Sequence, residues 1–159
     1  MTMDANELRR ALGHFVTGVT VVTTRCAAGT LQGITANSFS SVSLDPPLVL
    51  ISIARSLRSF LHFKHCNTFA IHLLSDEQRD ISCRFAGQGA DKWEGIEVQE
   101  GMGGVPLLPS RLGLFECTLH ATYDGGDHEI LLGRVVRCEV AADVPPLVFF
   151  KGSYRSIAA

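Results

Sequence analysis

The sequence of 159 residues predicts a mainly β protein with a few helices, folded as an antiparallel barrel. Two observations predict this fold class. About seven runs of strand-forming residues occur with only three helical segments, and hairpin-type turns join neighbouring runs where the chain allows. Alternating strand and helix units, which build parallel sheets, are not the pattern here. We therefore expect one barrel domain over residues 1–159.

The first part of the chain predicts a short helix followed by strands. Leu8, Leu12 and Phe15 lie at helical spacing, so we expect an amphipathic helix over residues 5–13 with its cap near Asn6. The next run is rich in Val and Thr, which lose side-chain freedom in a helix and suit a pleated sheet. Strands are expected over residues 15–24, 30–38 and 48–54, with bends at 27–29 and at 45–47, where two prolines stand.

The rest of the chain predicts two helices and several strands. Leu57, Phe60 and Leu61 share one face of an expected helix of about three turns over residues 56–66. Ser75 and Gln78 form a capping box that opens a helix through Phe85. Strands are expected over residues 68–74, 112–123, 129–140 and 146–150, with a hairpin turn at Asp124-Gly-Gly-Asp127 and glycine-rich surface loops at 87–95 and 100–106.

Composition excludes several classes of protein. The formal charge is −2 and no block of Lys or Arg occurs, which argues against nucleic acid and anionic membranes as partners. No apolar run reaches the length of a bilayer span, and the N-terminus lacks the apolar core of a secretory signal. The five cysteines are scattered, which predicts reduced thiols and a cytoplasmic location. With 46% apolar and only 19% charged residues, a homodimer that covers apolar surface is expected.

The most informative segment is GITANSFSSVSLDPPLVLISI, residues 33–53. Six hydroxyl or amide side chains fall between Thr35 and Ser43, without one charge among them. Strand-like apolar runs on both sides predict that these polar groups lie against a buried sheet. The segment therefore predicts a neutral surface that hydrogen-bonds a ligand, and a flat cofactor would suit it.

At these residues the chain resembles a known family. The resemblance rests on the order of motifs across nearly all of the chain: HFVTGVTVVTT, ITANSFSSVSLDPPLVL, TFAIHLLS, RFAG, DKWEG, PLL, GGDHEILLGRV and KGSY. In this order they resemble the flavin reductase-like proteins, the small NAD(P)H:flavin oxidoreductases that supply reduced flavin to two-component monooxygenases. Two departures are Cys26 in the first strand connection and Trp93 in DKW, where the family more often has DKF.

The resemblance implies a fold, an activity and a set of partners. The implied fold is the FMN-binding split β-barrel, an antiparallel Greek-key barrel. The implied activity is hydride transfer from NADH or NADPH to FMN or FAD, with reduced flavin passing to a separate oxygenase. The alternative is a flavin-binding barrel without turnover, such as a storage or sensor module, because one fold serves many functions.

The resemblance also assigns site residues. His128, in the GDH motif, is the expected catalytic residue and would position the nicotinamide against the flavin, while a proton-donor role stays open; read alone, it is an exposed loop histidine. Expected flavin-ring contacts are Thr35, Ala36, Asn37, Ser41, Ser43 and the backbone of Ile51, Ser52 and Ile53. Expected phosphate contacts are Ser38, Ser59 and Arg84. Further cofactor contacts are expected from Phe85, Lys92, Trp93 and Tyr154.

Each of these assignments has a plainer alternative. Ser38 and Ser59 could simply satisfy local backbone groups, as serines do at turns and caps. Lys92, Trp93 and Tyr154 could be ordinary surface or core. A metal site is not expected, because His62, His65 and Cys66 lack the paired spacing of a structural zinc site. No G-x-S-x-G, Rossmann or P-loop motif occurs, so serine hydrolase chemistry and those nucleotide sites are set aside.

Overall fold

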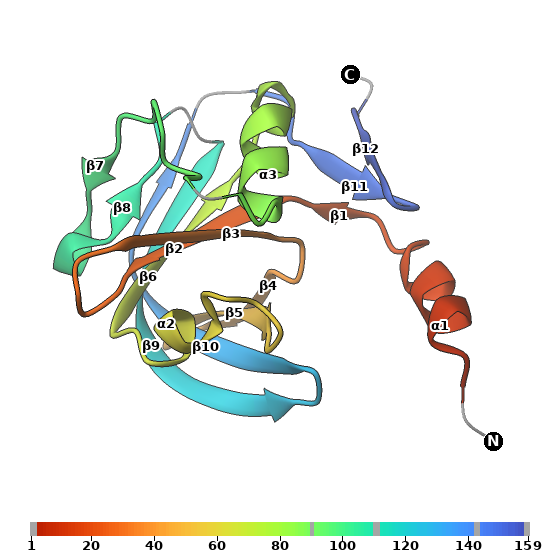
Figure 1. Cartoon of the computed structure of the whole chain (residues 1–159), viewed down its shortest axis with the longest axis horizontal. Coiled ribbons are helices and arrows are strands. Elements are labelled where there is room, and N and C mark those ends of the chain that lie inside the picture. Colours follow the sequence, from red (N-terminus) through yellow and green to blue (C-terminus); the bar gives the residue numbers. More distant parts are fainter. Residues whose placement is uncertain (1–2, 90, 110–111, 142–143, 158–159) are drawn as a thin grey trace.

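The centre of the molecule is an antiparallel sheet with the strand order β3-β2-β6-β9-β10-β5-β4 (Figure 1). The structure, a computed structural model, describes residues 3–89, 91–109, 112–141 and 144–157. The strands of this sheet are β2 (Thr20–Arg25), β3 (Leu31–Ala36), β4 (Ser40–Leu44), β5 (Pro47–Ala54), β6 (Thr68–Leu73), β9 (Gly113–Gly125) and β10 (His128–Val140).

The sheet curls into a barrel because its two edge strands are consecutive in sequence. β3 and β4 are joined by Asn37, Ser38 and Phe39, a link that spans at most roughly 14 Å. Ser38 ties β5 to the end of β3: its Oγ accepts a hydrogen bond from Ser52 N (3.0 Å) and donates one to Ser52 O (3.1 Å). The prediction of a mainly β, antiparallel barrel is confirmed, although the sheet is not hydrogen-bonded all the way round.

The barrel interior is filled by alternate residues of its strands. Along β5, Val49, Ile51 and Ile53 are buried, while Leu48, Leu50 and Ser52 are half-buried on the other face. The short helix α2 (Phe60–Lys64) contributes Phe63 to the same core cluster. Burial of this apolar set holds the two halves of the curled sheet together.

Helix α3 (Arg79–Ala86) packs outside the barrel against β2 and β3 (Figure 1). A short 3-10 helix, Asp76–Gln78, leads into it, and the capping box of Ser75 and Gln78 is present as predicted. Phe85, on the buried face of α3, belongs to a second core cluster together with Val21 and Leu74. This layer fixes α3 against the strand that carries Thr35.

The remaining elements lie around the barrel. β1 (Thr17–Gly18), β11 (Val148–Phe150) and β12 (Ser153–Arg155) form a small sheet, and β7 (Gln99–Glu100) pairs with β8 (Pro106–Leu107). Helix α1 (Ala5–Leu12) buries none of its residues and extends away from the barrel (Figure 1). Among the helices that the structure describes, none is long and apolar enough to cross a membrane.

The extent of one predicted helix and the capping residue of another differ in the structure. The predicted helix over residues 56–66 is only α2, because Leu57 N bonds Ala54 O and Phe60 N bonds Leu57 O in successive tight turns. These turns carry the chain off β5 and across the end of the barrel. The cap of α1 is Asp4 rather than Asn6, since an oxygen of the Asp4 side chain accepts from Asn6 N at 2.8 Å.

Several short strands escape the sequence patterns. β4 is rich in serine, and its two apolar residues, Val42 and Leu44, are exposed; β12 is three residues long. The predicted surface loop at 100–106 is partly buried: Val105 is 1% exposed, and Met102 N donates to the buried Glu116 carboxylate at 2.6 Å. A buried acceptor outside the segment therefore determines the fold of this loop.

Candidate functional site

His128 stands at the start of β10, where the β9–β10 hairpin turns through Gly126 and Asp127. Gly126 has φ +76°, a conformation that favours glycine, which explains the glycine in this turn. His128 Nδ1 lies 2.6 Å from Asp127 Oδ1. The hydrogen bond from His128 and then its charge lower the pKa of the Asp127 carboxyl. The imidazole is therefore oriented by a carboxylate, and its Nε2 has no hydrogen-bond partner within the described residues.

An ion-pair network braces the same hairpin against β5. Arg55 Nη2 lies 2.7 Å from Asp124 Oδ1 and 2.9 Å from Glu129 Oε2. Arg55 Nε also donates to the backbone oxygen of His128 at 3.1 Å. Lys64 of α2 lies 3.5 Å from the buried Glu129 carboxylate. One contact of this network, from Arg55, therefore reaches the backbone of His128 directly.

The predicted serine-rich segment lies close to this hairpin. His128 is paired with Ala54, two residues along β5 from Ser52, which is roughly 7 Å of strand. Ser38 is bonded to Ser52, and Asn37 is exposed with no side-chain hydrogen bond within the described residues. The fold therefore brings Asn37, Ser38 and Ser52 to the neighbourhood of His128.

The backbone groups of Ile51 and Ile53 on β5 are not available to the flavin ring as the sequence analysis expected. In an antiparallel pair, alternate residues direct N–H and C=O to the same neighbour. Both backbone groups of Ser52 bond Ser38, so those of Ile51 and Ile53 are directed to β10. Their side chains are fully buried. A direct contact of Ile51 or Ile53 with a surface ligand is therefore not supported, and the edge available to a ligand lies around Ser52.

The other residues of the serine-rich segment are distributed over two strands. Thr35 Oγ1 donates to Ser82 O at 2.6 Å and so ties β3 to α3. Ala36 is half-buried at the end of β3 and accepts from Thr20 Oγ1. Ser41 and Ser43 lie on β4, paired with Val49 and Leu48. Within the described residues, no hydrogen bond joins any of these side chains to His128.

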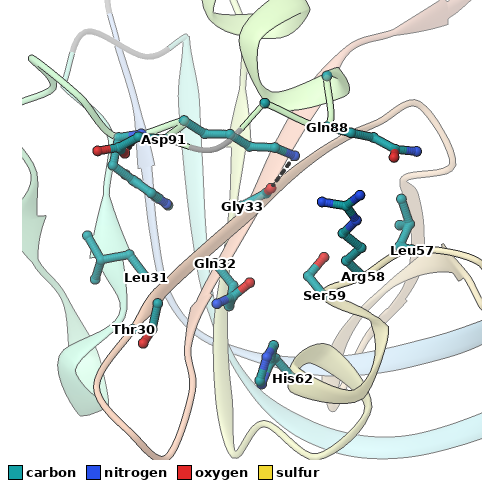
Figure 2. Close-up of a pocket in the computed structure, with 14 residues that line it drawn as sticks. Thr30, Leu31, Gln32, Gly33, Leu57, Arg58, Ser59, His62, Gln88 and Asp91 are labelled. Atoms are coloured by element: carbon teal, nitrogen blue, oxygen red, sulfur yellow. Dashed lines mark hydrogen bonds between the residues drawn. The ribbon is translucent and has the colours of Figure 1, made fainter.

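A pocket of about 530 Å³ lies at the other end of β3 (Figure 2). Figure 2 shows Arg58, Ser59 and His62 on one side of it and Gln32 and Gly33 of β3 on the other. The pocket is lined by Thr30, Leu31, Gln32, Gly33, Leu57, Arg58, Ser59, His62, Gly87, Gln88, Gly89, Asp91, Lys92 and Trp93. We call it the Arg58 pocket.

Lys92 and Trp93 form the wall of the Arg58 pocket nearest to α3. Lys92 Nζ donates to Phe85 O (2.9 Å) and Gly33 O (3.3 Å), and its partial burial lowers the pKa of the ammonium. Trp93 packs edge-on against Phe85, with ring centroids 4.9 Å apart. Phe85 itself is 1% exposed, so it supports the wall from beneath rather than reaching a ligand.

Arg84 and Tyr154 belong to the α3 layer and do not line the Arg58 pocket. Arg84 Nη1 donates to Glu94 O at 2.8 Å. The hydroxyl of Tyr154 lies 2.7 Å from Ser82 Oγ, and partial burial raises the pKa of Tyr154. Both side chains are therefore occupied in holding α3 and its following loop. Their assignment to a cofactor stays a prediction.

Sequence patterns missed the cations and amides that line the Arg58 pocket. Arg58 and His62 lie in the segment predicted as one helix, for which the sequence analysis used only the apolar residues Leu57, Phe60 and Leu61. Gln32 and Gln88 belong to no motif. The signal that could have found them is their closeness in sequence to Ser59 and to the DKWEG motif, which the resemblance does assign to the cofactor.

The residues present fit a flavin and a nucleotide. The neutral hydroxyl and amide groups beside His128 suit the polar edge of a flat ring, and the cationic Arg58 pocket suits a phosphate. Within the described residues, no group of three metal-ligating side chains occurs. The arrangement can bind, orient and hold a proton, but it offers no activated nucleophile.

Comparison with known proteins identifies the domain. The family described as flavin reductase like domain matches residues 12–158. A probable flavin reductase of Rhizobium meliloti (strain 1021) is 43% identical over 136 residues, which cover 86% of this chain and 44% of that protein. The FMN reductase (NADH) SmoA of Agrobacterium fabrum is 43% identical over 151 residues, which cover 95% of this chain and 85% of SmoA.

Solved structures agree with this match. The NADH:FAD oxidoreductase SgcE6 of Streptomyces globisporus, in complex with NAD and FAD fragments, superposes with a TM-score of 0.91 at 36% identity, covering 98% of this chain and 93% of that one. The chain spans about half the length of some relatives, 44% of the Rhizobium protein and 50% of the reductase component of the trigonelline monooxygenase of Acinetobacter baylyi.

Proposed function

Because the chain belongs to the flavin reductase-like family, we propose that it is an NAD(P)H:flavin oxidoreductase. It takes a hydride from NADH or NADPH and transfers it to FMN or FAD. The observation that supports this most strongly is the placement of His128 beside the Ser38–Ser52 link, at an exposed edge with neutral hydrogen-bonding groups. Relatives named as an FMN reductase (NADH) and an NADH:FAD oxidoreductase support the same reaction.

The chain's own residues bind and orient the two reactants. Bound flavin supplies the hydride acceptor and the nicotinamide supplies the donor. Asn37 offers free amide groups to the polar edge of the flavin ring, and Ser38 holds β5 in place behind it. The hydroxyl of Ser38 already donates its one proton to Ser52 O, so in this arrangement it has no proton left to donate to a phosphate.

His128 is proposed to position the nicotinamide. Asp127 fixes the orientation of its ring, and Arg55 holds its backbone. Nε2 can then meet the carboxamide of the nicotinamide, so that the reacting atoms approach within about 3–3.5 Å. A hydride carries both electrons and needs no proton in the same step, so positioning is sufficient for this role.

A separate oxygenase is the proposed consumer of reduced flavin. Relatives are named as reductase components, among them that of the trigonelline monooxygenase of Acinetobacter baylyi and the HsaB subunit of a flavin-dependent monooxygenase of Rhodococcus jostii. The predicted cytoplasmic location fits this role, and all five cysteines are free.

We also propose a homodimer, because the outer face of the barrel carries uncovered apolar side chains. Leu44 is 96% exposed, Tyr123 is 55% exposed and Val140 is 87% exposed. Large apolar side chains exposed to this extent are typical of surface that a partner subunit covers. Sedimentation analysis tests this directly: a mass of twice 17.2 kDa is expected, and a monomer at micromolar concentration would contradict it.

The reaction is tested by following the oxidation of NADH and of NADPH with and without added FMN or FAD. Flavin-dependent oxidation is expected. In His128→Ala, loss of nicotinamide positioning should lower kcat/KM by roughly 100-fold, while the flavin Kd changes much less. Flavin binding without any turnover of either nicotinamide would instead support a non-catalytic flavin-binding barrel.

A further inference from the structure

The β9–β10 hairpin carries a buried carboxylate that the proposed reaction does not use. Glu129 follows His128 in β10 and is 5% exposed. Its Oε2 lies 2.9 Å from Arg55 Nη2, and its Oε1 lies 3.5 Å from Lys64 Nζ. Both cations also lie over the ring of Phe60, at 6.0 Å and 5.9 Å from its centroid. Glu129 and Phe60 therefore restrict the position of the Arg55 side chain.

A buried ion pair of this kind is weak evidence for stability. Removing charged groups from water is costly, and replacing a buried pair by apolar residues of similar volume is often neutral or stabilising. The barrel already has an apolar core along the same two strands, with Ile51 and Ile53 of β5 and Leu131 of β10. What the pair adds is a defined position for one guanidinium. Its consequence for function therefore lies in what that guanidinium holds.

Arg55 holds the peptide segment that presents His128. The backbone N of Arg55 donates to Asp127 O at 2.9 Å, and its Nε donates to His128 O at 3.1 Å. Its Nη2 donates to Asp124 Oδ1 at 2.7 Å, and the same oxygen accepts from Gly126 N at 3.2 Å. One side chain and its own backbone thus reach both ends of the turn, from Asp124 to His128.

These contacts go to the hairpin and not to the proposed flavin side of the site. Within the described residues, Arg55 makes no hydrogen bond to Asn37, Ser38 or Ser52, the polar groups nearest to the proposed flavin ring. A change at Arg55 should therefore disturb His128 and leave the flavin contacts in place.

We infer that Arg55, held in place by Glu129, is a positioning residue for hydride transfer: it sets the position of His128, and through it that of the nicotinamide, without serving the flavin. The inference deepens the proposed function and rests on it for the role of His128. A misplacement of about 1 Å can cost a factor of about 100 in rate. Lysine at this position would keep the charge but lose the planar fork that meets His128 O and Asp124 at once.

Five variants separate geometry from charge. Arg55→Lys keeps the charge. Arg134→Lys is the matched control, because it makes the same exchange on β10 at an exposed arginine that has no hydrogen bond or ion pair within the described part of the chain. Asp124→Asn and Glu129→Gln each keep a side-chain oxygen for Arg55 but remove its charge. The double variant Arg55→Lys/His128→Ala is compared with His128→Ala alone.

Kinetics with NADH and NADPH give the first measurement. In Arg55→Lys, kcat/KM for the nicotinamide should fall by about ten- to 100-fold. The flavin Kd from calorimetry should change by less than about threefold, and Arg134→Lys should match the wild type. In the His128→Ala background, Arg55→Lys should change kcat/KM by less than about twofold, because residues that act through one group are not additive. Asp124→Asn and Glu129→Gln should show smaller losses in the same direction.

NMR of the histidine ring tests the geometry without turnover. The His128 ring signals, identified by their loss in His128→Ala, should shift in Arg55→Lys and stay unchanged in Arg134→Lys. The His128 hydrogen bond and charge lower the pKa of the Asp127 carboxyl, so that pKa should rise toward its ordinary value in Arg55→Lys as the pair loosens. Should Arg55→Lys not fold, the same comparisons are made with Asp124→Asn, whose side chain is 82% exposed.

Four outcomes would overturn the inference. The first is a wild-type kcat/KM in Arg55→Lys. The second is a fully additive loss in the double variant, which would mean that Arg55 acts apart from His128. The third is an equal loss of flavin affinity, which would assign Arg55 to the flavin. The fourth is an unchanged set of His128 signals in Arg55→Lys. Absence of turnover in the wild type would instead refute the proposed function, and the NMR comparison would still decide whether Arg55 sets the position of His128.

Discussion

Replacing Gly33 by alanine would force a methyl group into space that two aromatic rings already occupy. An ideal Cβ at Gly33 would lie 2.4 Å from Phe85 Cε1 and 3.1 Å from Trp93 Cζ2. Ordinary contacts are 3.4–4 Å, so the Phe85 ring would have to move by about 1 Å. Phe85 is 1% exposed and packed in the cluster beneath α3, which leaves little room for that movement.

The expected cost is that of overpacking a core, about 1–3 kcal/mol of unfolding free energy. For a chain of this length that corresponds to a fall in Tm of about 2–12 °C. Urea unfolding followed by circular dichroism measures the free energy, and the emission of Trp93 reports separately on the displaced pocket wall. Flavin affinity should also fall, since Trp93 is an expected cofactor contact and lines the Arg58 pocket.

Gly18→Ala is the matched control. Gly18 also lies in a strand, but an added Cβ would meet nothing within 4 Å. Its stability should stay within about 0.5 kcal/mol of the wild type. If Gly33→Ala were equally neutral and Trp93 emission unchanged, the account of β3, Phe85 and Trp93 as one tightly packed wall would be refuted.

Three further predictions follow from single contacts. Ser38→Ala leaves both backbone groups of Ser52 without their partner and should cost about 1–3 kcal/mol by urea unfolding; no change would mean that water replaces the hydroxyl. In His128→Ala, the pKa of Asp127 should rise to its ordinary range, because the hydrogen bond and charge that lower it are gone, as a carboxyl titration by NMR would detect. Burial and a nearby carboxylate raise the pKa of Cys117 from 9.0 to about 12, so the unfolded chain releases this proton first and unfolding free energy should fall as pH rises from about 9 to 12. Cys117→Ala should show a shallower fall over that window, and an identical pH dependence would contradict the assignment.

Local sequence signals were sufficient where neighbours along the chain determine the structure. The capping box of Ser75 and Gln78 and the turn at Gly126 depend on backbone groups only a few residues away, and both are found. The helix predicted over 56–66 is shorter in the structure because the chain leaves the end of β5 through tight turns at Leu57 and Phe60. The apolar spacing of the segment alone does not reveal these turns. β4 was missed because its pairing partner, rather than its own pattern, makes it a strand.

The sequence by itself determined the fold class, the family and the neutral segment from Thr35 to Ser43. Strand propensity, turn chemistry and motifs all depend on residues that are neighbours in the chain. Only the tertiary structure decided that Ser38 closes the barrel on Ser52, that the backbone of Ile51 and Ile53 is directed to β10, and that Arg58 faces β3 across a pocket. These contacts join residues brought together by the curling of the sheet. Their geometry depends on strand pairing and core packing, which no local pattern specifies.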